Sequence, residues 1–149
     1  MIVRPATRAD AAALGEVHAQ AFDAPWTGDD ILRFAGDRGG LALVAEGDAS
    51  ELAGFILCRL IAGEAEVPTL AVRPAARRRG VARSLLEAAL ELTRSTAGSM
   101  FLEVAEDNPG AIALYARTGF ERVGRRGSYY GRPGARPVDA IVMRRALNS

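Results

Sequence analysis

Residues 70–86 read LAVRPAARRRGVARSLL, and this stretch determines how the rest of the chain is interpreted. The apolar run at its start is typical of a strand, which ends at Arg73-Pro74 because proline cannot donate to the ladder. An arginine-rich turn with one glycine then leads into a segment with helical apolar spacing. The first turn of a helix carries amides without intrahelical partners and a positive dipole end, so this strand–turn–helix predicts an anion-binding site.

The turn itself reads Arg77-x-x-Gly80-x-Ala82, and its two small residues let an oxygen-rich group approach the backbone. Arginine side chains supply charge-assisted donors that suit a pyrophosphate and a 3′-phosphate. The arginines of the turn are Arg77, Arg78, Arg79 and Arg83. The competing interpretation is a solvated basic loop at the start of a surface helix. The register of strand, glycine and helix favours the anion site.

Two other phosphate-binding folds, the dinucleotide-binding fold and the P-loop fold, do not fit the sequence. No G-x-G-x-x-G follows the first strand, and no G-x-x-x-x-G-K-[ST] occurs, since all 19 basic residues are arginine. The absence of lysine also excludes a Schiff-base or general-base lysine. The remaining natural ligand is a cofactor with an extended arm that lies along an exposed strand edge such as residues 69–72.

The charges are distributed unevenly along the chain. Residues 1–66 carry 5 Arg against 11 Asp and Glu, and residues 67–149 carry 14 Arg against 7 acids. A formal net charge of +1 therefore conceals halves of −6 and +7. The basic second half suggests an anionic partner.

The chain is expected to be a single domain over residues 1–149, because its length suits one core and no repeat or linker interrupts it. One cysteine, Cys58, cannot form an internal disulfide, and one histidine, His18, cannot build a histidine-rich metal site. Both are expected to be structural, and no metal is expected. No apolar stretch has the length of a membrane span and Met1–Pro5 lacks the apolar core of a signal peptide, so we expect a soluble cytoplasmic protein.

The sequence predicts seven short strands, at residues 2–4, 41–45, 52–61, 64–72, 100–105, 120–124 and 140–144. Short turns separate the second, third and fourth strands, which indicates an antiparallel meander. The expected order is β-α-α-β-β-β-α-β-α-β-β, an α/β fold with a mixed sheet and helices packed against it. Between the last two strands, residues 127–137 are expected to form an irregular substrate loop.

Four helices are expected between the strands. Thr7–Asp10 and Thr27–Asp30 have the spacing of capping boxes and open the first two, of which the second ends near Gly36. The expected apolar face of the third consists of Leu85, Leu86, Ala89, Leu90 and Leu92. Asn108 is the expected N-cap of the fourth, and Gly119 follows its end as a C-cap glycine.

These features are similar to those of the GCN5-related N-acetyltransferases (GNATs), whose acetyl-CoA motif Q/R-x-x-G-x-G/A matches Arg77–Ala82. The motif is specific only to the superfamily. Over residues 25–140 the chain more closely resembles the bacterial ribosomal-protein alanine N-acetyltransferases of the RimI type. The stretches that carry this resemblance are Pro25-Trp26-Thr27, Leu70-Ala71-Val72-Arg73-Pro74, Leu102-Glu103-Val104, Asn108 with Ala111-Ile112-Ala113-Leu114-Tyr115, Gly119-Phe120, Arg125-Arg126, Tyr129-Tyr130 and Asp139-Ala140.

The resemblance implies the GNAT fold, with a mixed, mostly antiparallel central sheet of about seven strands flanked by about four helices. It implies acetyl-CoA as co-substrate and a protein N-terminal amine as acceptor, which in this group is the N-terminal alanine of a small-subunit ribosomal protein. The amine would attack the thioester directly, without an acyl-enzyme. Neither membrane binding nor direct nucleic-acid binding is expected.

The resemblance also implies roles for individual residues. Glu103 is the implied general base, and Tyr115 is the implied acid that protonates the departing thiolate. Asn108, two helical turns before Tyr115, would contact the pantetheine arm, and amides near Val72 would meet the thioester carbonyl. The implied acetyl-CoA site comprises Leu70, Ala71, Val72, Arg77, Arg78, Arg79, Gly80, Val81, Ala82, Arg83, Asn108 and Tyr115. The implied acceptor site comprises Trp26, Glu66, Tyr129 and Tyr130.

Each role has a structural alternative. Glu103 could be a solvated carboxylate at a strand end, although it interrupts an otherwise apolar strand, and Tyr115 could be a core aromatic residue. Glu66 on the preceding strand is a second candidate base that would act through water. Trp26 could be a packing anchor, and Tyr129-Tyr130 could anchor the last hairpin.

Other functions stay open at this stage. A GNAT that acts on a small-molecule amine or a lysine side chain would carry the same motif. A non-catalytic acyl-CoA sensor would keep the Arg/Gly turn but would not need Glu103 or Tyr115. Nucleic-acid binding through the basic half is the last alternative, because the arginine run is short and lacks interleaved aromatic residues.

Overall fold

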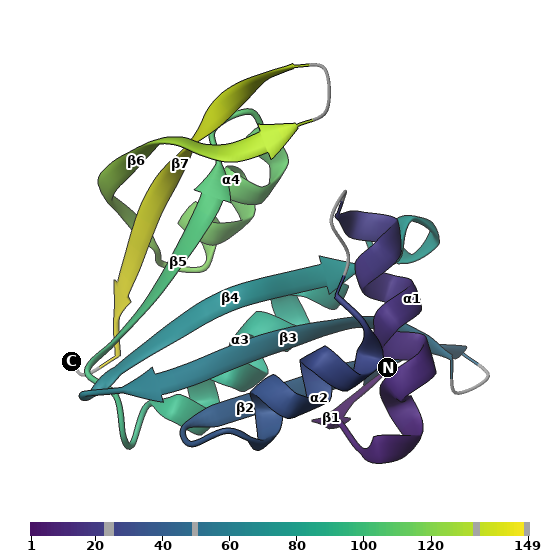
Figure 1. Ribbon diagram of the computed structural model, residues 1–149. Helices are drawn as coiled ribbons and strands as arrows, with labels where there is room; N and C mark the ends of the chain where they lie inside the picture. The colour runs from purple at the N-terminus through teal and green to yellow at the C-terminus, as the bar shows by residue number, and fades with distance from the viewer. Residues whose placement is uncertain (23–25, 49–50, 133–134, 148–149) are drawn as a thin grey trace.

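The computed structural model describes residues 1–22, 26–48, 51–132 and 135–147, and the side chains of residues 128–136 lie outside the described part (Figure 1). The strands are β1 Ile2–Pro5, β2 Gly40–Glu46, β3 Leu52–Ile61, β4 Glu64–Val72, β5 Ser99–Ala105, β6 Glu121–Arg132 and β7 Ala135–Ala146. The helices are α1 Ala11–Ala21, α2 Gly28–Gly36, α3 Val81–Thr93 and α4 Pro109–Arg117. This is the order that the sequence predicts.

The strands form one mixed sheet with the order β1-β2-β3-β4-β5-β7-β6. Neighbouring strands pair antiparallel except β4 and β5, which run parallel because α3 connects them across the sheet. The expected meander of β2, β3 and β4 is confirmed. Among the described residues, no helix is long and apolar enough to cross a membrane.

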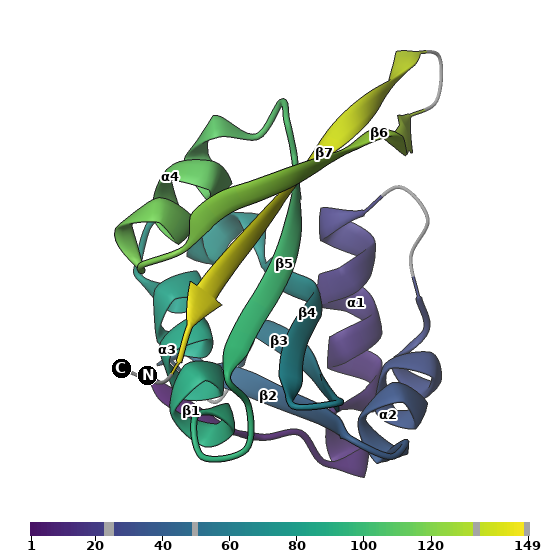
Figure 2. The same cartoon turned by 90° about the vertical axis from the view of Figure 1, so that its left-hand side faces the viewer.

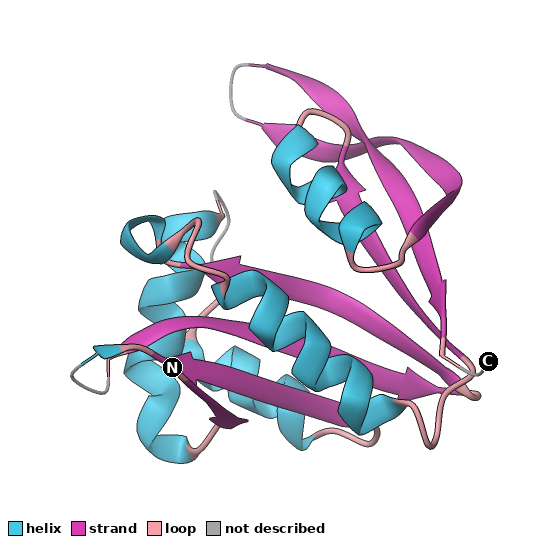
Figure 3. Ribbon diagram, turned by 180° about the vertical axis from the view of Figure 1, so that it is seen from behind, coloured by secondary structure: helices cyan, strands magenta, loops and turns pink. Residues whose placement is uncertain are grey.

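The helices cover the sheet on both faces. Helices α1 and α2 lie on one face and α3 and α4 on the other (Figures 2 and 3). The larger buried cluster is built on the second face by Leu85, Leu86 and Ala89 of α3 with side chains from the sheet and α4. The smaller cluster joins α1 and α2 to β2, β3 and β4 around Phe55, which is fully buried.

Local hydrogen bonds explain where the first helices begin. Asp10 accepts hydrogen bonds from the backbone N–H and the hydroxyl of Thr7, at 2.7 and 3.3 Å, and a single 3-10 turn precedes α1. Thr27 and Asp30 make the reciprocal bonds of the second capping box, at 3.1 and 3.3 Å, and α2 ends at Gly36 as expected.

A β-bulge separates the two halves of β4. Leu57 of β3 faces Thr69 and Arg59 faces Glu66, so Cys58 alone lies opposite the two residues Val67 and Pro68. Proline has no N–H to donate, which suits an interrupted ladder.

The parallel pairing of β4 with β5 ends beside this bulge, at Val67 and Leu102. Beyond that point the two strands diverge, and the sheet opens into a V in Figure 1. The edge of residues 69–72 that faces β5 is therefore unpaired, as the sequence predicts, and Glu103 lies one residue past the last pair.

Two expectations are wrong. Residues 127–132 and 135–137 are not irregular, because they belong to β6, which continues to Arg132, and to β7, which begins at Ala135; the pairing of these two strands shifts register at three places. Pairing of β7 with β5 begins only at Ala140, so Pro137 lies on an edge where the missing N–H is tolerated. Leu92 is 55% exposed, and Thr93 takes the core position in the last turn of α3, where its hydroxyl donates to the carbonyl of Ala89 at 2.8 Å.

Candidate active site

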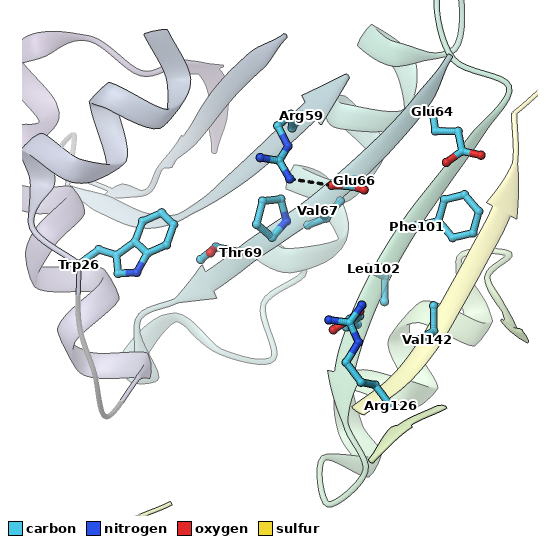
Figure 4. A pocket seen from close by; sticks show the side chains of 12 residues that line it. Trp26, Arg59, Glu64, Glu66, Val67, Thr69, Phe101, Leu102, Arg126 and Val142 are labelled. Atoms are coloured by element: carbon cyan, nitrogen blue, oxygen red, sulfur yellow. Dashed lines mark hydrogen bonds and ion pairs between the residues drawn. The ribbon is translucent and has the colours of Figure 1, made fainter. Parts of the chain in front are cut away.

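A pocket of about 630 Å³ lies where β4 and β5 diverge, on the face of the sheet that α1 and α2 cover. Figure 4 shows two walls that face each other across it. One wall belongs to β3 and β4 and carries Arg59, Glu66 and Thr69, and the other belongs to β5, β6 and β7 and carries Phe101, Glu103 and Arg126. Trp26 also lines the pocket, beside the wall that carries Thr69.

Strand alternation directs Glu103 into this pocket. Met100, Leu102 and Val104 of β5 are buried in the cluster beneath α3 and α4, so the residues between them face the opposite side. The Glu103 carboxylate is 23% exposed and lies 2.9 Å from Nη2 of Arg126. A carboxylate on the rim of a pocket can accept a proton from a bound amine.

The position of Arg126 in β6 is stabilised by the ion pairs of its neighbour in that strand. Its neighbour Arg125 forms ion pairs with Glu106 at 2.9 Å and with Asp139 at 3.0 Å, which tie β6 to the end of β5 and to β7. The two carboxylates raise the pKa of Arg125, Glu106 by the larger amount. Sequence reasoning assigned no role to Arg126, because its contact with Glu103 depends on β7 lying between β5 and β6.

The wall formed by β3 and β4 also carries an ion pair. Nη2 of Arg59 donates to Oε2 of Glu66 at 3.0 Å, and the guanidinium lies 5.8 Å from the centre of the Phe34 ring. Glu66 therefore shares the pocket with Glu103, as expected of a second candidate base. Arg59 was missed because only the antiparallel register of β3 and β4 places it opposite Glu66.

Trp26 stands between the pocket and a smaller neighbouring hollow of about 340 Å³. Its side chain is 39% exposed, and its backbone N–H donates to Nδ1 of His18 at 3.0 Å. The smaller hollow is lined on α2 and just beyond it by Asp30, Arg33, Phe34 and Asp37 as well as Trp26. Trp26 is thus both a packing residue and part of a wall.

The arginine-rich turn lies at the far end of β4. Gly80 is the N-cap of α3 with φ +77°, and Arg78 has φ +65°, a left-handed conformation that is uncommon for a residue with a side chain. A Cβ at Gly80 would meet nothing within 4 Å, so the space beside the helix start is open. Arg77, Arg78, Arg79 and Arg83 are all exposed. Arg73 anchors the entry to the turn by donating from Nε to the carbonyl of Leu52 at 2.6 Å.

The structure does not place Tyr115 in the pocket. Tyr115 is 9% exposed and packs within the cluster beneath α3 and α4, with its ring 6.0 Å from that of Phe120. It therefore lies on the opposite face of β5 from Glu103. Asn108 caps α4 by accepting from the N–H of Ala111 at 3.2 Å, as expected of an N-cap.

The remaining candidate residues take ordinary positions or lie outside the description. Leu70 and Val72 are half-buried and Ala71 is buried, all along the unpaired half of β4. The side chains of Tyr129 and Tyr130 lie outside the described residues, and their backbone belongs to β6.

Cys58 and His18 are buried, as expected of structural residues. Burial raises the pKa of the Cys58 thiol to about 12, so its nucleophilic thiolate is scarce at neutral pH. The described residues contain no group of three or more His, Cys, Asp or Glu side chains that could hold a metal ion.

Residues 11–120 match the Acetyltransferase (GNAT) family. The chain is 40% identical to the N-alpha-acetyltransferase RimI of Mycobacterium tuberculosis, over 93% of this chain and 88% of that protein. It is 34% identical to the [ribosomal protein bS18]-alanine N-acetyltransferase of Escherichia coli K12, over 86% of this chain and 84% of that protein. The crystal structure of the ribosomal-protein-S18-alanine N-acetyltransferase from Escherichia coli matches with a TM-score of 0.88 and 27% identity, covering 99% of this chain and 94% of that one.

Proposed function

The chain belongs to the GNAT acetyltransferase family, and from this premise we propose that it transfers an acetyl group from acetyl-CoA to the α-amine of a protein N-terminus. The acceptor that we propose is the N-terminal alanine of a small-subunit ribosomal protein, in keeping with the bS18-alanine N-acetyltransferase of Escherichia coli. We further propose that residues 1–149 form a single domain with both binding sites. The position of Glu103 in a pocket at the divergence of β4 and β5 is the observation that carries the proposal.

The residues at the start of α3 fit the phosphates of acetyl-CoA. The N–H groups of Val81, Ala82 and Arg83 belong to the first helical turn, where no intrahelical acceptor is in reach. The open space beside Gly80 leaves room for an anion, and the exposed arginines supply charge-assisted donors. The unpaired edge of Leu70–Val72 offers backbone groups to the amide-rich pantetheine arm.

The chemistry has three requirements. The acceptor amine must lose a proton, the thioester oxygen must be polarised, and the departing thiolate must gain a proton. Acetyl-CoA supplies the activated acyl group. In our proposal Glu103 takes the proton of the acceptor directly, and Glu66 on the facing wall is the second candidate base, which would act through water. Amides near Val72 polarise the carbonyl oxygen.

Tyr115 is the proposed acid, and its burial on the α4 face sets a condition for that role. It can reach the sulfur only through the opening between β4 and β5, from the side opposite Glu103. Acid and base would then approach the reacting atoms from two faces of the sheet. Because Tyr115→Phe keeps the ring that packs on Phe120, this variant should retain its fold and its affinity for acetyl-CoA while kcat falls.

The acceptor class is tested by offering acetyl-CoA with a panel of amines and following CoA release. The panel contains peptides that begin with Ala, Ser or Met, an N-blocked peptide with one internal lysine, and a polyamine. We expect turnover of the N-terminal peptides, fastest for Ala. Turnover confined to the blocked peptide or the polyamine would refute the proposed acceptor, and acetyl-CoA binding without turnover of any amine would indicate a sensor.

A further inference from the structure

We infer that His18 is a positioning residue for the acceptor site, whose neutral imidazole fixes Trp26 between the two hollows so that the acceptor peptide is bound. The inference rests on the proposed function, because it concerns the same acceptor site. It makes acceptor binding, but not acetyl-CoA binding, sensitive to protonation of one buried side chain.

His18 holds Trp26 by two kinds of contact. The backbone N–H of Trp26 donates to Nδ1 of His18 at 3.0 Å, and the two rings stack with centroids 5.8 Å apart and an interplanar angle of 16°. His18 itself is 4% exposed and is fixed by the rings of Phe22 and Phe55, at 4.5 and 6.3 Å. His18 is therefore held in one position by its packing, and it fixes the position of Trp26, which is 39% exposed.

The direction of the hydrogen bond fixes the protonation state. Because Nδ1 accepts from Trp26, the single proton of the neutral ring must be on Nε2. A second proton would turn Nδ1 into a donor that faces another donor, and the bond to the Trp26 backbone would be lost. It would also place a charge among aromatic side chains, which their π faces would offset only in part.

Most charged groups on the elements packed around His18 form ion pairs elsewhere, and Asp29 of α2 is exposed. Within the described residues, Glu16 of α1 pairs with Arg73, Asp30 of α2 pairs with Arg33, and Arg59 of β3 pairs with Glu66. Asp10 before α1 pairs with Arg4. Burial lowers the pKa of His18 from its ordinary 6.5, so the ring is neutral at pH 7 and gains its proton only in more acidic solution.

The contact with Trp26 links the protonation state of His18 to the acceptor site. It lines the pocket that holds Glu103 and also the hollow beside Asp30 and Asp37, and its ring lies 6.3 Å from that of Phe34. If the N-terminal amine of a bound peptide lies at Glu103, the residues that follow it in the peptide extend along the pocket past Trp26. Release of the Trp26 backbone would therefore loosen the wall on which the residues after the N-terminus pack.

Two variants separate the hydrogen bond from the fold. In His18→Asn the amide oxygen can occupy the place of Nδ1 and accept from Trp26, but the side chain does not titrate. In His18→Leu the acceptor is lost and an apolar side chain fills the space. Gln20→Leu, at an exposed position of the same helix, is the matched control.

The chain contains one His and one Trp, so their contact can be followed without an activity assay. We expect the Trp26 fluorescence of the wild type to titrate together with the His18 ring proton signal in NMR, with a midpoint below pH 6.5. Fluorescence of His18→Asn should not follow that titration. A wild-type fluorescence that is indifferent to the protonation of His18 would overturn the inference.

The kinetic readout is the KM for the acceptor peptide against the Kd for acetyl-CoA. For His18→Leu we expect the KM to rise about fivefold to tenfold, the effect of one lost hydrogen bond, with an unchanged Kd and kcat within about twofold. His18→Asn should keep a KM within about threefold of the wild type, and it should lack the rise in KM that we expect of the wild type as His18 is protonated below pH 6.5. Gln20→Leu should match the wild type throughout.

Two outcomes would overturn the inference on the kinetic side. One is a wild-type KM in His18→Leu, and the other is the same acidic rise in KM in His18→Asn as in the wild type. If His18→Leu does not fold, His18→Asn and the fluorescence titration decide. If the wild type acetylates only a lysine side chain or a polyamine, the proposed function fails instead, and the same variants are compared with that acceptor.

Discussion

Nη2 of Arg126 lies 2.9 Å from Oε1 of Glu103, so the carboxylate that we propose as general base is already in an ion pair before any acceptor binds. The two side chains come from β6 and β5, which are separated in the sheet by β7. An incoming ammonium group must share this carboxylate with Arg126 or replace the guanidinium. The pair therefore holds the Glu103 side chain beside Arg126 in the pocket while the acceptor is absent.

Glu103→Gln tests the base directly. The amide has the same shape but cannot accept a proton, so kcat should fall by about a hundredfold or more while the Kd for acetyl-CoA is unchanged. Steady-state kinetics and a cofactor titration measure the two quantities. The control is Glu91→Gln on the exposed face of α3, whose partner Arg94 lies outside the proposed site, and this variant should behave as wild type. If Glu103→Gln keeps its rate and Glu66→Gln loses it, the base is on the facing wall.

Arg126→Gln tests whether the ion pair competes with the acceptor. The pair is partly exposed, and such pairs contribute at most about 1 kcal/mol, so the KM for the acceptor should fall by no more than about fivefold. The kcat should stay within about threefold, because Arg126 is not given a role in the reaction. A loss of kcat as large as that of Glu103→Gln would show instead that Arg126 is needed to orient the carboxylate.

Arg77→Ala/Arg79→Ala tests the phosphate site. Removal of two donors should weaken acetyl-CoA binding by about tenfold to a hundredfold, and the remaining affinity should depend less on salt. Isothermal titration at two ionic strengths measures both effects. Arg94→Ala/Arg117→Ala removes the same charge from exposed positions at the far ends of α3 and α4 and should leave the affinity unchanged. Equal loss in both double variants would indicate only a general charge effect.

Local sequence signals account for most of the fold. The capping box Thr27–Asp30 fixes where α2 begins, and Gly119, with φ +95°, ends α4 as a C-cap glycine should. These signals act within a few residues, so they can be recognised without tertiary structure. Leu92 shows the limit of these local signals. A residue on the expected apolar face of a helix is buried only if another element packs against it, and Leu92 is exposed.

The site was only partly predictable, because its geometry depends on pairings between distant strands. Glu103 and Glu66, the two candidate bases, share a pocket, but the bulge opposite Cys58 beside this pocket has no signature in the sequence beyond Pro68. The partners Arg126 and Arg59 could be found only once the strand order and the register of β3 with β4 were known.

Cys58→Ala tests the direct route against an acyl-enzyme. Burial raises the pKa of this thiol to about 12, so the thiolate is scarce at pH 7 and the native protein should react with an aromatic disulfide reagent only after unfolding. The variant should keep kcat within about twofold, and its small cavity should lower the free energy of unfolding by about 1 kcal/mol. Capture of an acetyl group on Cys58 in the intact protein would contradict direct attack.

Asp10→Asn tests a pH-dependent contribution to stability. Both carboxylate oxygens of Asp10 accept from Arg4 at 2.9 Å, and this contact, aided by the N–H of Thr7, holds the pKa of Asp10 below its usual 3.8. The unfolded chain therefore binds this proton first as the pH falls. The stabilisation is complete well above pH 3.8 and is lost below it, as the pH passes through the lower pKa of the folded state.

At pH 7 the variant should lose about 2 to 3 kcal/mol of unfolding free energy in urea, because Asp10 is only 6% exposed and its charge-assisted bonds are broken. Asp30→Asn changes the same position of the other capping box, where the side chain is 47% exposed, and should cost at most about 1 kcal/mol. The gap between Asp10→Asn and the wild type should narrow toward pH 3, since the unfolded wild-type chain then binds a proton at Asp10 and the stabilisation that this carboxylate provides is being lost. A gap that stays constant from pH 7 to pH 3 would mean that Asp10 contributes through packing and not through its charge.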